Sequence, residues 1–128
     1  MMEALQPAGA LYKQGEYAAA LQIVRNLWEK IPDPKTQDGN AYNVIEYAVA
    51  LCIKLNDLDS AWLWANKSFP FGEKTHVMGE GEFLIGKVAF LRGDMDAARE
   101  NFAVAHKKSG GRIFKGEDPK YKALLKKK

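Results

Sequence analysis

Three stretches of the sequence decide the fold: Gln14-Gly-Glu-Tyr-Ala-Ala-Ala-Leu21, Leu55-Asn-Asp-Leu-Asp-Ser-Ala-Trp62 and Arg92-Gly-Asp-Met-Asp-Ala-Ala-Arg99. Each stretch places glycine or asparagine before an acid, then an apolar residue, then an alanine three residues further on. These alanines, Ala20, Ala61 and Ala98, are 41 and 37 residues apart. Self-similarity at such a spacing indicates a short structural unit that occurs three times.

Each stretch predicts a turn between two helices. Gly15, Asn56 and Gly93 tolerate the left-handed backbone conformation that ends many helices. The acid that follows lies at the start of the next helix, where the helix dipole favours negative charge. The apolar residue is expected to fill the junction, and the small alanine lets the two helices cross closely. We therefore expect all three alanines to be buried.

Apolar residues recur at helical spacing on both sides of these turns. Leading helices are predicted over 41–55 and 81–91, and Gly86 in the second of them allows a close helix contact. The first leading helix contains Pro7, which either lies in its first turn or begins a short helix that ends near Gln14. Longer loops are predicted at 33–40 and 70–79.

This pattern resembles the tetratricopeptide repeat. The likeness is best in Gly15-Glu-Tyr-Ala-Ala-Ala-Leu21 and in Gly93-Asp-Met-Asp-Ala-Ala98, whereas the second unit has Asn56 in the glycine place. The resemblance covers residues 8–108. It implies an all-α fold of three antiparallel helical hairpins, a TPR-like α-solenoid, with units at about 1–34, 40–70 and 79–108 of one domain, 1–128.

The end of the chain, 109–128, differs from the repeats. It is a glycine-punctuated loop in which Ile113 and Phe114 are the expected apolar anchors. Asp118 and Pro119 form an N-cap and first-position pair, which predicts a short helix over 119–127. We expect this helix to cap the open end of the helix stack. The ending resembles small stand-alone bacterial proteins of this repeat type, which are associated with toxin–immunity gene neighbourhoods.

The composition is that of a soluble globular chain, with 47% apolar and 27% charged residues among 128. No apolar run reaches the roughly 18 residues that a membrane-spanning helix needs. The first 14 residues do not combine a basic stretch with an apolar block, as a secretory signal would. We therefore expect a cytoplasmic protein that does not enter a membrane.

Catalytic and metal-binding patterns are not found in the sequence. Cys52 is the only cysteine and lies among apolar neighbours, so we expect a buried, inert thiol. His76 and His106 are 30 residues apart, and no metal-ligand spacing or nucleophile motif accompanies them. Paired acids such as Glu80 and Glu82 flank helix starts, where the dipole explains them. The expected protein is not an enzyme and carries no cofactor or metal.

The charges are distributed unevenly. Residues 107–128 contain nine basic and two acidic residues, whereas residues 1–106 contain ten basic and fourteen acidic residues. The basic segment predicts an alternative function, binding of nucleic acid or another anionic surface, with Arg112 and Lys115 as the candidate contacts. A solvated helix face with a loose lysine-rich end is the other interpretation, and it makes a nucleic-acid partner the less favoured one.

In tetratricopeptide repeats the first helix of each unit lines the concave face. Carried over to this chain, the resemblance places nine residues of mixed polar, charged and aromatic character on that surface: Tyr12, Lys13, Asn43, Glu46, Ala50, Lys54, Phe83, Lys87 and Phe90. Such a composition is typical of a binding surface. Phe83 or Phe90 has an alternative role, packing against the capping helix.

Trp62 and Trp64 lie two residues apart on one helix, so they cannot both face inward. One of them should be partly exposed, and Trp64 is therefore a secondary candidate for partner contact. We expect a non-catalytic protein–protein interaction module whose partner is a protein. An immunity protein that neutralises a cognate bacterial toxin is one concrete case.

Overall fold

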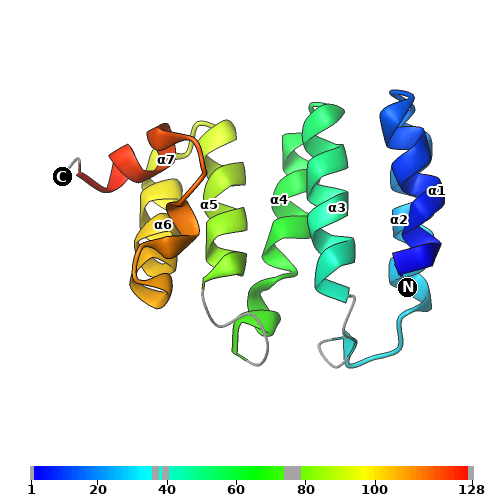
Figure 1. Cartoon of the computed structure of the whole chain (residues 1–128), viewed down its shortest axis with the longest axis horizontal. Coiled ribbons are helices and arrows are strands. Elements are labelled where there is room, and N and C mark those ends of the chain that lie inside the picture. Colours follow the sequence, from blue (N-terminus) through cyan, green and yellow to red (C-terminus); the bar gives the residue numbers. More distant parts are fainter. Residues whose placement is uncertain (1, 36–37, 39–40, 74–78, 127–128) are drawn as a thin grey trace. The chain divides into compact units, whose positions relative to one another are not determined.

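The structure is a computed structural model that describes residues 2–35, 38, 41–73 and 79–126. Helices dominate it, and no strand occurs among these residues. Within the described ranges, short 3-10 helices cover Phe69–Glu73, Arg112–Phe114 and Leu124–Lys126. The α-helices, shown in Figure 1, are α1 (Met2–Lys13), α2 (Tyr17–Lys30), α3 (Ala41–Lys54), α4 (Leu58–Asn66), α5 (Glu80–Leu91), α6 (Met95–Ser109) and α7 (Pro119–Ala123). The predicted all-α class is confirmed.

The three repeated stretches form the same turn. Gly15, Asn56 and Gly93 all have a positive φ, of 80°, 58° and 83°. In each turn the following amide donates to a carbonyl five residues back, as from Asp57 to Cys52 at 2.8 Å. The residue with positive φ itself donates to a carbonyl three residues back. Together these two bonds are the Schellman pattern, which satisfies the last carbonyls of the preceding helix.

The alanines that follow the three turns are buried, as predicted. Ala20, Ala61 and Ala98 each expose 0% of their surface. The amide of each donates to the carbonyl of the residue four positions earlier, at 3.0 Å, so the equivalent hydrogen bond opens each second helix. The three alanines thus occupy structurally equivalent positions in the three repeated stretches.

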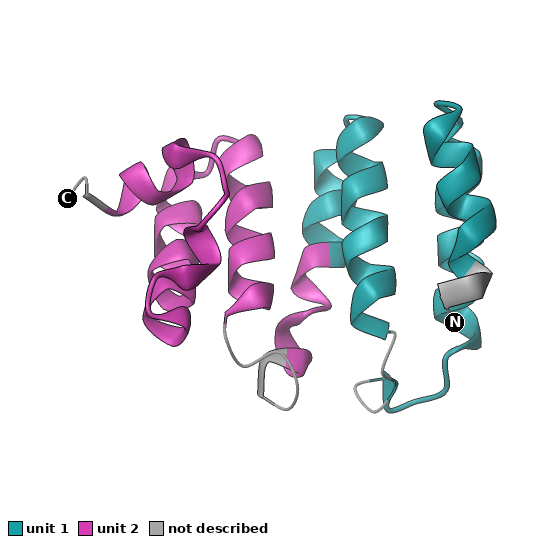
Figure 2. Cartoon of the chain, viewed as in Figure 1, with its two compact units in different colours: residues 1–64 teal, residues 65–128 magenta. Residues whose placement is uncertain are grey.

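The chain divides into two compact units, Met1–Trp64 and Ala65–Lys128, which Figure 2 colours separately. In unit 1, α2 packs against both α1 and α3. Its core is aliphatic, with Val24, Ile45 and Leu51 fully buried. At one edge of this core the indole rings of Trp28 and Trp64 meet edge to face, with centroids 5.5 Å apart.

Helix α1 corrects the expectation for Pro7. The helix begins at Met2, so Pro7 lies inside it rather than in its first turn or at its start. Proline has no amide proton, and the carbonyl four residues earlier therefore lacks its usual helical donor. Leu5 and Ala8, on either side of Pro7, are buried, which indicates that packing on unit 1 outweighs the missing hydrogen bond.

In unit 2, α5 and α6 pack closely because Gly86 has no side chain. A Cβ at Gly86 would lie 2.6 Å from Cδ1 and Cε1 of Phe102, far inside normal contact distance. Phe102 is fully buried against this gap. A salt bridge of 2.8 Å from Lys108 Nζ to Glu82 Oε2 links the same two helices. The predicted role of Gly86 in a close contact is confirmed.

The C-terminal segment closes unit 2. Asp118 caps α7 by accepting a hydrogen bond from the Lys120 amide at 3.0 Å, and Pro119 follows as the first helical residue. The helix is shorter than predicted, because it ends at Ala123 and continues as a 3-10 turn. Phe114 anchors the preceding loop and is buried. Parts of the predicted loops at 33–40 and 70–79, as well as His76, lie outside the described residues.

Candidate functional site

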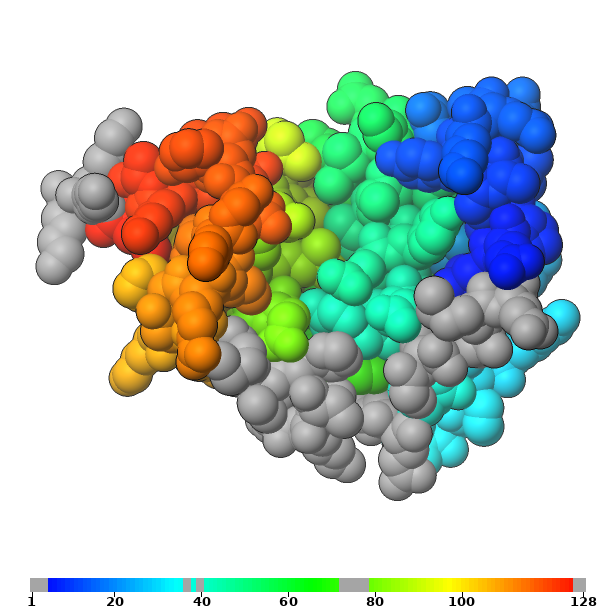
Figure 3. All heavy atoms as spheres, in the orientation of Figure 1, coloured from blue at the N-terminus to red at the C-terminus, as the bar shows by residue number. Residues whose placement is uncertain are grey.

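A groove in unit 1 runs between α1 and α3 and has a volume of about 680 Å³. In the space-filling view the side chains of α1, in blue, and of α3, in blue-green, border each other on the face shown (Figure 3). We call this feature the α1–α3 groove. Its described lining residues are Leu5, Gln6, Gly9 and Tyr12 from α1 and Asn43, Glu46, Tyr47 and Ala50 from α3.

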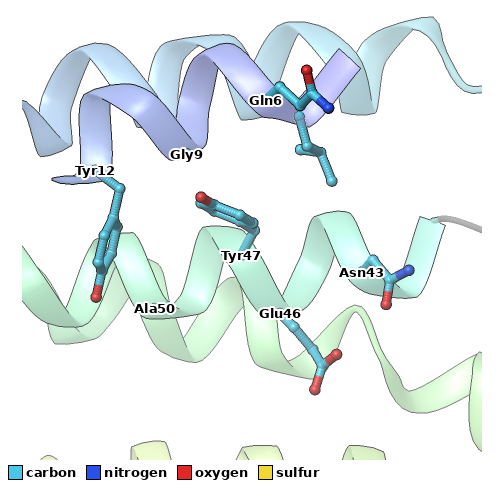
Figure 4. A pocket seen from close by; sticks show the side chains of 8 residues that line it. Gln6, Gly9, Tyr12, Asn43, Glu46, Tyr47 and Ala50 are labelled. Carbon is cyan, nitrogen blue, oxygen red and sulfur yellow. The ribbon is translucent and has the colours of Figure 1, made fainter. Parts of the chain in front are cut away.

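Two of the residues that line the groove are small. Gly9 on α1 and Ala50 on α3 both line it, and Ala50 is exposed. A Cβ at Gly9 would lie 3.1 Å from the hydroxyl oxygen of Tyr47. The missing side chain therefore lets Tyr47 approach α1, as Figure 4 shows from close by.

Two tyrosines, Tyr12 and Tyr47, form the aromatic wall of the groove, and Tyr17 of α2 contacts one of them without lining the groove itself. Tyr12 of α1 contacts Tyr17 of α2 with ring centroids 5.3 Å apart, and Tyr47 of α3 at 6.3 Å. Both contacts are edge to face, the geometry that aromatic quadrupoles favour. The wall is half-buried rather than buried, so the rings keep surface that a ligand can cover.

Charged and amide side chains lie along the α3 border of the groove. Asn43 and Glu46 are exposed and point away from α1 (Figure 4). Lys54, in the last turn of α3, places its Nζ 6.0 Å from the centre of the Tyr12 ring. Lys13 ends α1 and is exposed. Both lysines also complement the negative end of a helix dipole.

Five of the six predicted surface residues of unit 1 therefore lie together, whereas Lys13 is not among the residues that line the groove. Tyr12, Asn43, Glu46 and Ala50 line one groove, and Lys54 contacts its aromatic wall. Sequence reasoning missed Gly9 and Tyr47. Tyr47 lies four residues after Asn43, so helical spacing alone was sufficient to find it. Gly9 was hidden because Pro7 obscured the extent of the first helix.

The predicted residues of unit 2 have other contacts. Phe83 is only 5% exposed, and its ring meets those of Phe102, Phe114 and Tyr121 at 5.1–6.0 Å. Phe90 is half-buried and meets Tyr121 at 5.4 Å. Phe83 thus belongs to the core beneath the capping segment, which was the alternative role for these rings. Lys87 lies over the Phe83 ring at 5.1 Å.

The secondary candidates also include both buried and exposed side chains. Trp64 is 8% exposed and packs on Trp28, so it is not a contact surface. Trp62 is the partly exposed member of the pair. Arg112 and Lys115 are both exposed, as expected for a basic contact. The Arg112 Nε donates to the Ser109 carbonyl at 3.1 Å, which ties this side chain to the end of α6.

Among the described residues no cluster of three or more His, Cys, Asp or Glu side chains is arranged to hold a metal ion. No described helix is long and apolar enough to cross a membrane. No protein-family model matches the chain, and a search of curated proteins finds none that matches it.

Proposed function

We propose that this chain is a non-catalytic, tetratricopeptide-like module that binds a short segment of a protein partner in the α1–α3 groove. The observation that carries the proposal is the meeting of Tyr12, Asn43, Glu46 and Ala50, all expected on a partner surface, around one hollow. The three equivalent turns support the repeat character of the chain. A toxin neutralised by an immunity protein is one partner of this kind.

The chemistry of the groove suits binding rather than reaction. Glu46 is the only carboxylic acid among the described lining residues, and no histidine or cysteine is among them. In proton-transfer or nucleophilic catalysis, such a carboxylate needs a second group that it activates or that activates it. Tyrosine walls instead provide large apolar area at low entropic cost, and they often dominate binding energy when a partner covers them.

The test begins with peptides selected from a random library on the full chain, whose affinities are then measured by calorimetry. Tyr12→Ala removes the central ring and should weaken binding about thirtyfold, the effect of a typical aromatic anchor. Ala50→Trp should abolish binding, because the added indole ring fills the groove. Ala18→Trp is the matched control, since Ala18 is exposed on α2 and does not line the groove.

Folding of all three variants is checked by circular dichroism and thermal unfolding before affinity is compared. Peptides that bind all three variants with wild-type affinity would place the binding site elsewhere and refute the proposal. Loss of binding in the Ala18→Trp control as well would indicate a general effect of added bulk, which also contradicts a site limited to the groove.

A further inference from the structure

Two opposite charges lie at separate positions along the α1–α3 groove. Glu46 lines the groove on α3, and Lys54 is eight residues further along the same helix, over the Tyr12 ring. At 1.5 Å per residue their backbone positions are about 12 Å apart along the helix axis. Between them lies Ala50, whose small and exposed side chain also lines the groove.

We propose that the groove selects a peptide segment with a lysine or arginine at Glu46, an apolar side chain over Ala50 and an acidic residue at Lys54. This inference rests on the proposed function and assigns the chemical class of its ligand. Charge complementarity determines the two ends of the segment, and the small side chain of Ala50 leaves room for an apolar residue in the middle. An extended chain covers about 3.3 Å per residue, so the two charged residues should be about four positions apart.

The surroundings of the groove favour a ligand with a basic end. Residues 1–64 contain five basic and eight acidic residues, so a cation approaches unit 1 through an attractive field. At the other end of the groove, the Lys54 ammonium group lies over the Tyr12 ring. No carboxylate is paired with it among the described ion pairs. An acidic side chain of the ligand would give that ammonium group its opposite charge.

The probe is the blocked peptide acetyl-Lys-Thr-Leu-Thr-Glu-amide, whose termini carry no charge. It is titrated into the isotope-labelled full chain, and the amide signals of Gly9 and Ala50 are followed by NMR. Control peptides replace lysine, glutamate or both by glutamine. Each exposed ion pair should contribute about two- to fivefold in affinity, so the doubly substituted peptide should bind weakest.

Double-mutant cycles separate the two contacts. Glu46→Gln should remove the penalty of the lysine-to-glutamine change in the peptide and leave the penalty of the glutamate change intact. Lys54→Gln should do the reverse. Glu29→Gln, an exposed acid on α2 that does not line the groove, is the matched control and should couple to neither peptide residue.

The outcomes distinguish this inference from the proposed function. Binding that shifts Gly9 and Ala50 but shows no coupling with Glu46 or Lys54 would overturn the charge assignment and leave the groove as the binding site. A preference for peptides with two like charges would also overturn it. If neither this probe nor any library-selected peptide shifts the groove signals, both the inference and the proposed function are wrong.

Discussion

At the scale of single residues, the contact between α5 and α6 depends on one missing methyl group. The added Cβ of Gly86→Ala would come within 2.6 Å of the buried Phe102 ring, and Phe102 has no exposed side toward which it can move. Overpacking of this kind typically costs about 1–3 kcal/mol, more than the roughly 1 kcal/mol that alanine gains over glycine in a helix. We predict a net loss of stability, measured by urea unfolding.

The matched control for this prediction is Gly9→Ala in α1. There the added Cβ would meet the hydroxyl tip of Tyr47 at 3.1 Å, and the tip of a half-buried side chain can move. The loss at Gly9 should therefore be smaller than the loss at Gly86. Equal unfolding midpoints for wild type and Gly86→Ala would show that the two helices are not packed as closely as the structure indicates.

The thiol of Cys52 makes stability depend on pH. The pKa of this thiol is raised from 9.0 to about 11, chiefly by burial and also by the Asp57 carboxylate, while Arg25 opposes the rise. The folded chain thus keeps the proton to higher pH than the unfolded chain does. The resulting stabilisation is fully present below about pH 9 and is lost as pH rises toward about 11.

Urea unfolding near neutral pH and at about pH 10, for wild type and Cys52→Ala, measures this effect. Other groups titrate in both proteins, so only the difference between them reports the thiol. We expect the wild type to lose more stability than Cys52→Ala over this interval. An identical loss in the two proteins would mean that the thiol does not titrate differently on folding.

At the scale of helices and turns, the sequence predicts the fold well where local chemistry decides it. Positive φ at Gly15, Asn56 and Gly93, and the cap at Asp118, follow from what those residue types allow. The exception is α1. Local rules predict that a proline interrupts a helix. The helix nevertheless continues through Pro7, because the apolar residues around it are buried on unit 1.

The candidate site was predictable only in part, because helical spacing says which face a residue shares but not what covers that face. Asn43, Glu46 and Ala50 share one stripe of α3, and they line the groove together. By the same helical spacing, Phe83 was expected on the partner-binding face of α5. Its ring is covered by Phe114 and Tyr121, which come from about thirty or more positions later in the chain. Such long-range packing leaves no signal in local periodicity.

At the scale of the whole molecule, the two units differ in charge. Residues 1–64 contain five basic and eight acidic residues, whereas residues 65–128 contain fourteen basic and eight acidic residues. The groove lies in the acidic unit, and the exposed Arg112 and Lys115 lie in the basic one. The proposed protein binding in the groove and the alternative, anion binding on the basic segment, can therefore be tested separately.

The two binding modes should differ in how strongly salt weakens their affinity, because they involve different numbers of charges. A segment held by two exposed ion pairs and an apolar contact should lose about threefold or less in affinity between 50 and 200 mM salt. Binding of nucleic acid through several lysines and arginines would lose about a thousandfold or more over the same range, because each phosphate contact releases a counterion. Fluorescence anisotropy with a groove peptide and with a DNA duplex measures both on the same protein.

The variant Arg112→Ala with Lys115→Ala provides the spatial control for this measurement. Both side chains are exposed, so their removal should leave the fold and the affinity of the groove peptide unchanged. Any affinity for the duplex should fall, and its dependence on salt should become shallower by about one unit of log–log slope for each basic side chain removed. A groove peptide whose affinity falls steeply with salt, and falls again in this variant, would assign partner binding to the basic segment instead.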